Sequence, residues 1–148
     1  MSVDPDLASR EFPPTPPYLV GREKVREFAR AVFADAPQHV DVDAARAAGY
    51  ADVVAPPTFA MVIADLTLQQ LLGDPTTGVV LERALHVDQT FRYTRPIVAG
   101  DELTGRLRVT RVRAMGDGAM VTSETDVVDA DGSPVVTTVS TLLIGSED

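Results

Sequence analysis

Residues 53–75 read VVAPPTFAMVIADLTLQQLLGDP, and this stretch decides the fold. A prolyl pair followed by Thr58 is a typical helix entry, and the Gly-Asp-Pro sequence at 73–75 is a typical helix exit. The spacing therefore predicts a helix over residues 58–72. Apolar residues fall on nearly every side of this helix, and Asp65 is its one charged residue. Because a helix that is apolar almost all round must be buried almost all round, other parts of the chain must wrap it.

Four segments with the pattern of strands follow the helix. Apolar and polar residues alternate from Leu85 to Tyr93, which predicts a strand with His86 and Gln89 on opposite faces. Three further segments with strand patterns end in turn residues, and they cover 103–112, 120–128 and 135–144. An Asp-Gly pair joins the last two and is a strong hairpin signal. One buried helix followed by an antiparallel meander is an α+β layout, in which the sheet curls round the helix.

The part of the chain before the buried helix contains an arm and two shorter helices. Five prolines lie within residues 1–17, and because proline lacks an N–H group we expect a proline-rich arm without regular structure. Residues 22–32 have one apolar face at helical spacing, and 44–48 form a short helix that an aspartate caps and Gly49 ends. The length of 148 residues predicts one domain, which we place at 18–148.

Composition excludes several classes of function. The net charge is −9, so nucleic acid is not an expected partner. The chain has no cysteine, which excludes disulfides, thiolate metal sites and cysteine nucleophiles. No metal or nucleotide motif is visible, and we expect no cofactor. No apolar run reaches the roughly 18 residues that cross a bilayer, and residues 1–10 lack the features of a signal peptide. We therefore expect a cytoplasmic protein without a membrane segment.

Several segments together resemble one protein family. They read GREKVREFARAV at 21–32, AGY at 48–50, VAPPTF at 54–59, VDQ at 87–89 and RPIVAGD at 95–101. In this combination the chain resembles the small actinobacterial MaoC-like (3R)-hydroxyacyl thioester dehydratase subunits, which act on long acyl groups on acyl carrier protein, and their uncharacterised relatives. The resemblance extends from about residue 18 to 144. It implies a single hot-dog domain, in which a curved antiparallel sheet wraps a long central helix.

The catalytic signature of that family is Gly-Asp-x-Asn-Pro-x-His, and residues 33–39 of this chain read FADAPQH. His39 matches the family's histidine, whereas Ala34 stands at the aspartate position and Ala36 at the asparagine position. Asp35 follows one residue later and could be a displaced member of the catalytic pair. Alternatively, Asp35 is an exposed turn residue, and His39 is a loop histidine that contributes little packing and is bonded to backbone or solvent.

The resemblance also implies where a substrate would lie. We expect an acyl thioester to contact Ala55 and the start of the buried helix at Thr58, Phe59 and Ala60. The free N–H groups of a helix start could hold the thioester carbonyl oxygen. Pro57 has no N–H group to contribute, and the alternative is an ordinary helix start with a threonine cap.

Three functions are consistent with these residues. The chain could be a (3R)-hydroxyacyl thioester dehydratase or hydratase with a modified catalytic pair. It could instead be a non-catalytic subunit that lines the acyl channel and stabilises a hot-dog partner that carries the intact pair. The third candidate is a thioesterase that uses Asp65, since some hot-dog enzymes carry a carboxylate on this helix. The intact Pro-x-His spacing favours the first two, and Ala34 and Ala36 favour the second over the first.

Two further features concern partners. A lone hot-dog sheet has a pairable edge, so we expect a homodimer or a heterodimer with another hot-dog subunit. Four arginines, at 106, 108, 111 and 113, lie on one predicted strand. They could bind an acidic acyl carrier protein, or they could be a solvated strand face.

Overall fold

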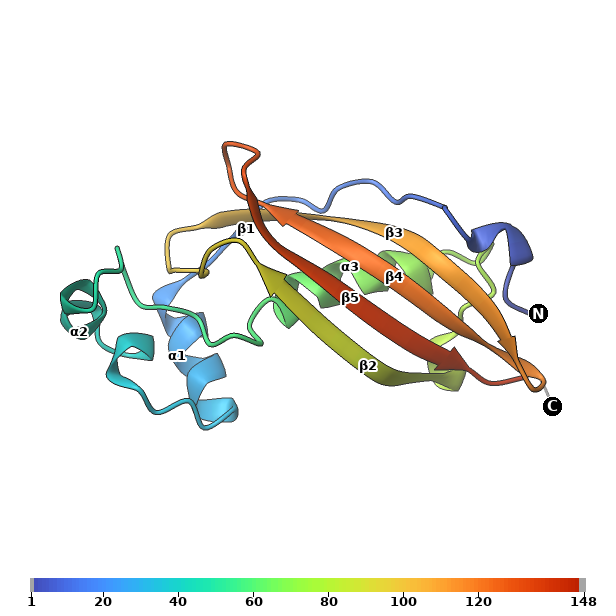
Figure 1. The fold of residues 1–148 in the computed structure, drawn as a ribbon, viewed down its shortest axis with the longest axis horizontal. Helices are drawn as coiled ribbons and strands as arrows, with labels where there is room; N and C mark the ends of the chain where they lie inside the picture. Colours follow the sequence, from blue (N-terminus) through green and yellow to red (C-terminus); the bar gives the residue numbers. More distant parts are fainter. Residues whose placement is uncertain (1, 147–148) are drawn as a thin grey trace.

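The structure is a computed structural model that describes residues 2–146. One antiparallel sheet of five strands curls around one helix, and its strand order is β1-β3-β4-β5-β2 (Figure 1). The strands are β1 (Tyr18–Leu19), β2 (Ala84–Tyr93), β3 (Glu102–Met115), β4 (Gly118–Val128) and β5 (Pro134–Ile144). The helices are α1 (Arg22–Ala31), α2 (Val42–Ala47) and α3 (Met61–Gly73), with short 3-10 turns η1 (Pro5–Leu7), η2 (Pro37–His39) and η3 (Leu81–Arg83). This is the α+β hot-dog arrangement that the sequence predicted.

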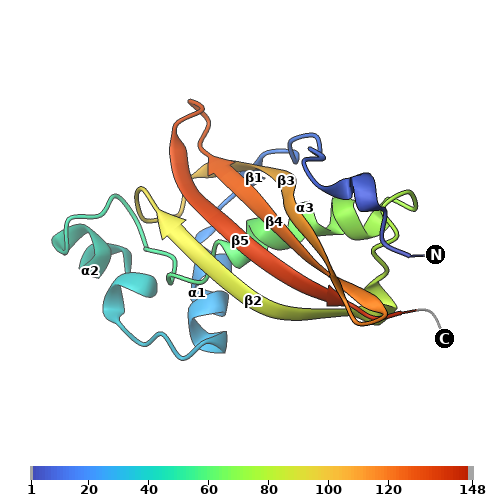
Figure 2. The ribbon, with the colours of Figure 1, turned by 45° about the vertical axis from the view of Figure 1, so that its right-hand side comes forward.

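The predicted central helix is α3, and it lies along the concave side of the sheet (Figures 1 and 2). It begins at Met61, three residues later than expected, because tight turns precede it: Phe59 N–H donates to the Pro56 carbonyl and Met61 N–H to the Thr58 carbonyl. Its burial is incomplete on one side, where Asp65 and Gln69 are exposed. The prediction of burial on nearly every side was therefore wrong for one face, because the sheet covers only the opposite face of the helix.

The closest approach of α3 to the sheet lies over Gly105 of β3. A Cβ atom at this position would lie 2.9 Å from the methyl groups of both Ile63 and Thr67. The Thr67 hydroxyl donates to the Ala64 carbonyl at 2.7 Å and therefore accepts from the Thr125 hydroxyl of β4, also at 2.7 Å. The helix thus rests directly on the backbone of β3.

A band of small polar residues crosses the core at the level of this contact. On either side of it the core is apolar, with one cluster around Phe59 and Ile63 and a second around Leu71 and Leu107. The band consists of Thr67, Ser123, Thr125, Thr138 and Ser140, each at most 3% exposed. Because the inward residues of β4 and β5 alternate with outward ones, these strands have the period of two that the sequence predicted.

Strand β2 differs from the expected alternation. The register with β5 shifts between His86 and Asp88, so that His86 lies opposite Leu142 and Gln89 opposite Ser140. Because Leu142 and Ser140 are two residues apart on β5, His86 and Gln89 share a face, and His86 Nε2 lies 3.0 Å from the Gln89 amide oxygen. Their expected placement on opposite faces was wrong, because one extra residue in a bulge reverses the alternation.

The proline-rich arm lies along the outer edge of β3. The N–H groups of Ser9, Phe12 and Thr15 donate in turn to carbonyl groups of β3. Leu7 and Phe12 are buried in the core, so this segment covers an edge that the two-residue β1 leaves largely open.

A domain boundary at residue 17 stays a prediction. Among the described residues, no helix is long and apolar enough to cross a membrane.

We predict that Gly105→Ala destabilises the protein by about 1–3 kcal/mol, because its methyl group would push α3 off β3. The measurement is the denaturant midpoint of unfolding. Gly73→Ala is the matched control, since nothing lies within 4 Å of a Cβ there and φ is not positive. Equal midpoints for the two variants would contradict the account of the helix contact.

Candidate functional site

His39 is held in one orientation at the end of η2. Its side chain is buried, and Nδ1 lies 2.6 Å from the Val54 carbonyl oxygen. A carbonyl oxygen can only accept, so Nδ1 carries the hydrogen and the Nε2 lone pair is free in the neutral ring. The expectation of a loop histidine that contributes little packing was wrong, because the 3-10 turn directs the ring inward. The expected backbone bond is present, and it occupies Nδ1.

The segment around Val54 connects His39 to the sheet. Val54 N–H donates to the Gln38 carbonyl at 2.9 Å, which ties the segment to the histidine turn. On its other side, Ala55 N–H donates to the Ile97 carbonyl and Ala99 N–H to the Val53 carbonyl. The acceptor of the His39 hydrogen bond is therefore fixed to the chain that leaves β2.

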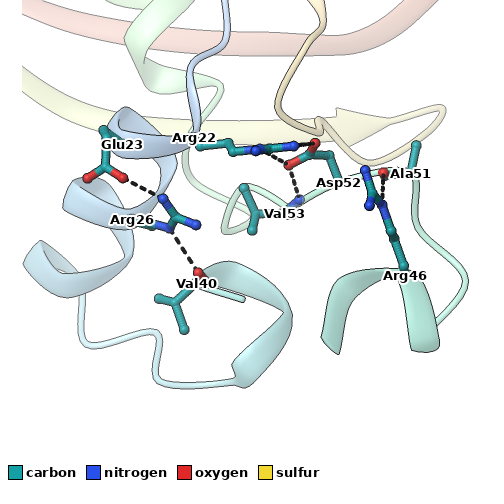
Figure 3. A network of polar contacts seen from close by, with 8 residues as sticks. All are labelled: Arg22, Glu23, Arg26, Val40, Arg46, Ala51, Asp52 and Val53. Atoms are coloured by element: carbon teal, nitrogen blue, oxygen red, sulfur yellow. Dashed lines mark hydrogen bonds and ion pairs between the residues drawn. The ribbon is translucent and has the colours of Figure 1, made fainter. Parts of the chain in front are cut away.

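A polar network from α1 and α2 braces this region from outside (Figure 3). Arg22 binds both oxygens of Asp52, whose Oδ1 also accepts from Val53 N–H. The hydrogen bond from Arg22 is the main reason that the pKa of Asp52 is lowered. Arg26 is oriented by Glu23 and donates to the Val40 carbonyl at 2.8 Å, directly after His39. Helix α1 therefore holds the chain on both sides of the imidazole.

A cavity of about 430 Å³ lies beside His39. Its walls come from the histidine turn, from the segment at 54–57 and from the end of β2 with the residues after it. Among the described residues no aspartate or glutamate lines it. Arg95 lines it but is neutralised by Asp101 and Asp129, which bind the guanidinium from outside the cavity wall. The cavity thus offers an imidazole without a carboxylate partner.

Tyr93, the last residue of β2, contributes a phenol to the same cavity. Its hydroxyl donates to the Pro57 carbonyl at 2.6 Å, which ties the end of β2 to the turns before α3. Burial raises the pKa of Tyr93 to about 12, and a hydrogen bond with the Ala60 backbone lowers it only in part. Sequence reasoning missed this residue, because its place in an alternating strand indicated only an apolar ring facing the core.

The acidic residue expected beside His39 lies elsewhere. Asp35 is exposed and is not part of the cavity wall, whereas Ala34, at the family's aspartate position, is half-buried. Phe33 precedes it with φ at 57° and is 90% exposed. A glycine adopts this left-handed conformation readily, and the resemblance places a glycine at this position, whereas this chain has a phenylalanine there.

The expected substrate contacts are only partly brought together. Ala55 lines the cavity beside His39. Phe59 is fully buried instead, where its ring packs edge-on against Phe28 at 5.2 Å between centroids. Thr58 is exposed and Ala60 is buried, and neither is part of the cavity wall. Asp65, exposed on α3, accepts from the Gln69 amide and does not share the cavity with His39.

The arginine strand is β3. Arg106, Arg111 and Arg113 are exposed, while Arg108 pairs with Glu124 and Asp126 of the neighbouring strand. Among residues 2–146 no group of three or more histidine, cysteine, aspartate or glutamate residues could hold a metal ion.

Comparison with known proteins finds one matching family model and several similar proteins. The family model described as "FAS1-like, dehydratase domain region" matches residues 8–138. A UPF0336 protein of Leifsonia xyli is 56% identical over 99% of this chain and 98% of its own length. A UPF0336 protein of Clavibacter michiganensis is 57% identical over 100% of this chain and 99% of its own length.

Solved structures agree with the fold. One chain of the C-terminally truncated HadBC (3R-hydroxyacyl-ACP dehydratase) complex from Mycobacterium tuberculosis is 31% identical with a TM-score of 0.84, over 93% of this chain and 97% of that one. A MaoC-like dehydratase is 34% identical with a TM-score of 0.85, over 96% of this chain and 43% of that one. With the family model matching residues 8–138, the chain belongs to the FAS1-like dehydratase domain region family, among the MaoC-like hot-dog dehydratases.

Proposed function

We propose that the chain is a subunit of a (3R)-hydroxyacyl thioester dehydratase or hydratase that has low activity, or none, by itself. One observation carries the proposal: His39, whose Nδ1 bonds to the Val54 carbonyl, lines a cavity in whose described wall no carboxylate lies. The substrates would be acyl thioesters of coenzyme A or of an acyl carrier protein. For a carrier protein, the exposed arginines of β3 are the proposed contact, since Arg106, Arg111 and Arg113 gather positive charge on one strand of an acidic chain.

The chemistry requires two proton transfers. In dehydration, a base removes a proton from C2 of the hydroxyacyl group and an acid protonates the hydroxyl that leaves C3 as water; hydration is the reverse. His39 Nε2 can accept or return one proton, but this cavity supplies no carboxylate to share the second transfer or to stabilise the imidazolium. Loss of one general acid–base group typically costs about 10²–10⁴-fold in rate.

The free edge of the sheet supports a second candidate, a companion subunit beside a catalytic hot-dog partner. Within residues 2–146, β2 pairs only with β5, and its other edge stays open over ten residues with Leu85 61% exposed. Open edges of this length are usually paired or covered. The similar HadBC chain belongs to a complex, and the similar MaoC-like dehydratase is long enough for a second domain of this size. Asp65 lies off the cavity, so we do not propose the thioesterase.

We predict that neutral His39 is the tautomer protonated at Nδ1, because the Val54 carbonyl can only accept. The chain has two histidines, so the ¹⁵N spectrum of histidine-labelled protein at pH 8 contains two rings. A His86→Asn variant leaves only the His39 ring and assigns it. A ring protonated at Nε2 would show that the basic nitrogen faces Val54 and not the cavity.

Ala34→Asp is expected to raise the hydration rate of crotonyl-CoA at least about tenfold over the wild-type chain, because it returns a general acid–base group to the family position. The measurement is the loss of enoyl absorbance. Ala31→Asp adds the same charge at an exposed position of α1 and is the matched control. An Ala34→Asp protein that folds and gains no activity would favour the companion subunit.

Asp35→Asn tests the displaced catalytic pair, since loss of any wild-type activity would assign Asp35 a role.

Leu85→Lys is expected to dissociate a self-associated or partner-bound chain, because a charged side chain on an edge strand opposes pairing. Sedimentation velocity at micromolar concentration, with or without a co-expressed hot-dog partner, measures the assembly. Leu19→Lys changes an equally exposed leucine on the opposite side of the sheet and should leave the assembly intact. An unchanged assembly of Leu85→Lys would contradict association through β2.

A further inference from the structure

Two of the backbone donors before α3 are engaged within the turns there. Phe59 N–H donates to Pro56 and Met61 N–H to Thr58, while Pro56 and Pro57 have no N–H group. Phe59, Ala60 and Met61 do not line the His39 cavity, whereas Tyr93 does. The phenol is therefore a hydroxyl donor that a carbonyl group in this cavity can reach.

Tyr93 lies in the cavity wall, next to the turns before α3. Its ring lines the cavity together with His39 and Ala55, and the side chain is 37% exposed. Its hydroxyl donates to the Pro57 carbonyl at 2.6 Å. The phenol is therefore held in position by a backbone group at the wall of the cavity.

We propose that the Tyr93 hydroxyl is the hydrogen-bond donor with which this cavity holds the carbonyl oxygen of an acyl thioester, in place of the backbone N–H groups before α3. The proposal rests on the proposed function, since it names the group that would recognise the thioester in the same cavity. On binding, the O–H turns from the Pro57 carbonyl to the ligand carbonyl. Pro57 is exposed, so water can replace the phenol there.

Three properties suit Tyr93 for this role. Burial keeps the pKa of the phenol near 12, so the group remains a donor at every physiological pH. The hydrogen bond to the Pro57 carbonyl holds the hydroxyl in place before a ligand arrives, and a donor positioned in advance favours binding. Arg95, the cationic side chain of the cavity wall, is occupied by Asp101 and Asp129 and cannot turn to the ligand without breaking those pairs.

Crotonyl-CoA labelled with ¹³C at the carbonyl is the probe, with the full chain. Calorimetry measures its affinity, and isotope-edited infrared difference spectra measure its carbonyl stretch. Tyr93→Phe is expected to weaken binding by about five- to tenfold, as expected for one lost hydrogen bond. The stretch should lie at lower frequency on the wild-type protein than in water and return toward the higher frequency of an unbonded carbonyl in Tyr93→Phe. Tyr50→Phe is the matched control, since Tyr50 lines the same cavity and has no described hydrogen bond to the residues before α3.

The outcomes separate this proposal from the function on which it rests. Binding with unchanged affinity and frequency in Tyr93→Phe overturns the role of Tyr93 and leaves the dehydratase subunit standing. A wild-type complex whose carbonyl frequency is not lowered also overturns the role of Tyr93, and this measurement needs no variant. If neither crotonyl-CoA nor dodecenoyl-CoA binds the wild-type chain, the thioester cavity itself is wrong. An equal loss in Tyr50→Phe would mean that the cavity wall, and not the Tyr93 hydroxyl, sets the affinity.

Discussion

The contact between α3 and the backbone of β3 at Gly105 is the constraint on which the rest of the molecule depends. The helix can rest on the sheet only because no side chain stands at this position, and the Thr67–Thr125 hydrogen bond fixes the helix there. The two apolar clusters fill the space on either side of this contact. A shift of α3 away from β3 would displace both ends of the helix, since packed interiors leave little room for adjustment. One of these ends borders the candidate site.

The site is assembled where three separate parts of the chain meet at one end of the sheet. The turns before α3 supply Pro57, the end of β2 supplies Tyr93, and the segment between α1 and α2 supplies His39. Figures 1 and 2 show α1 and α2 together at this end, with both termini at the other. The helical pair packs on the apolar cluster through Val25 and Phe28 of α1 and Val42 of α2, and Arg26 of α1 donates to the Val40 carbonyl beside His39. It therefore adds to the core and also supports the chain that carries the imidazole.

The loop that carries His39 holds a backbone conformation that its sequence does not favour. A bulky residue in the left-handed region costs roughly 1–2 kcal/mol, and Phe33 adopts this conformation with its ring almost fully exposed. The packing of His39 and the hydrogen bond from Ala34 N–H to the Ala29 carbonyl hold the backbone there. The hydrogen bond between His39 and Val54 thus forms with an alanine at position 34.

The sequence by itself determined the element order, the buried helix, the four long strands and the position of His39, because these follow from local periodicity, turn residues and a short motif. It could not determine which apolar positions of α3 remain open, since that depends on how far the sheet curls. The bulge at residues 86–88 reversed a strand face without any glycine to mark it. Tyr93 and the Val54 carbonyl became parts of the site only through tertiary contacts between residues 36 and 15 positions apart. The physical reason is that a sequence pattern specifies which side of an element is apolar, whereas the meeting of two hydrogen-bonding atoms depends on how every element between them packs.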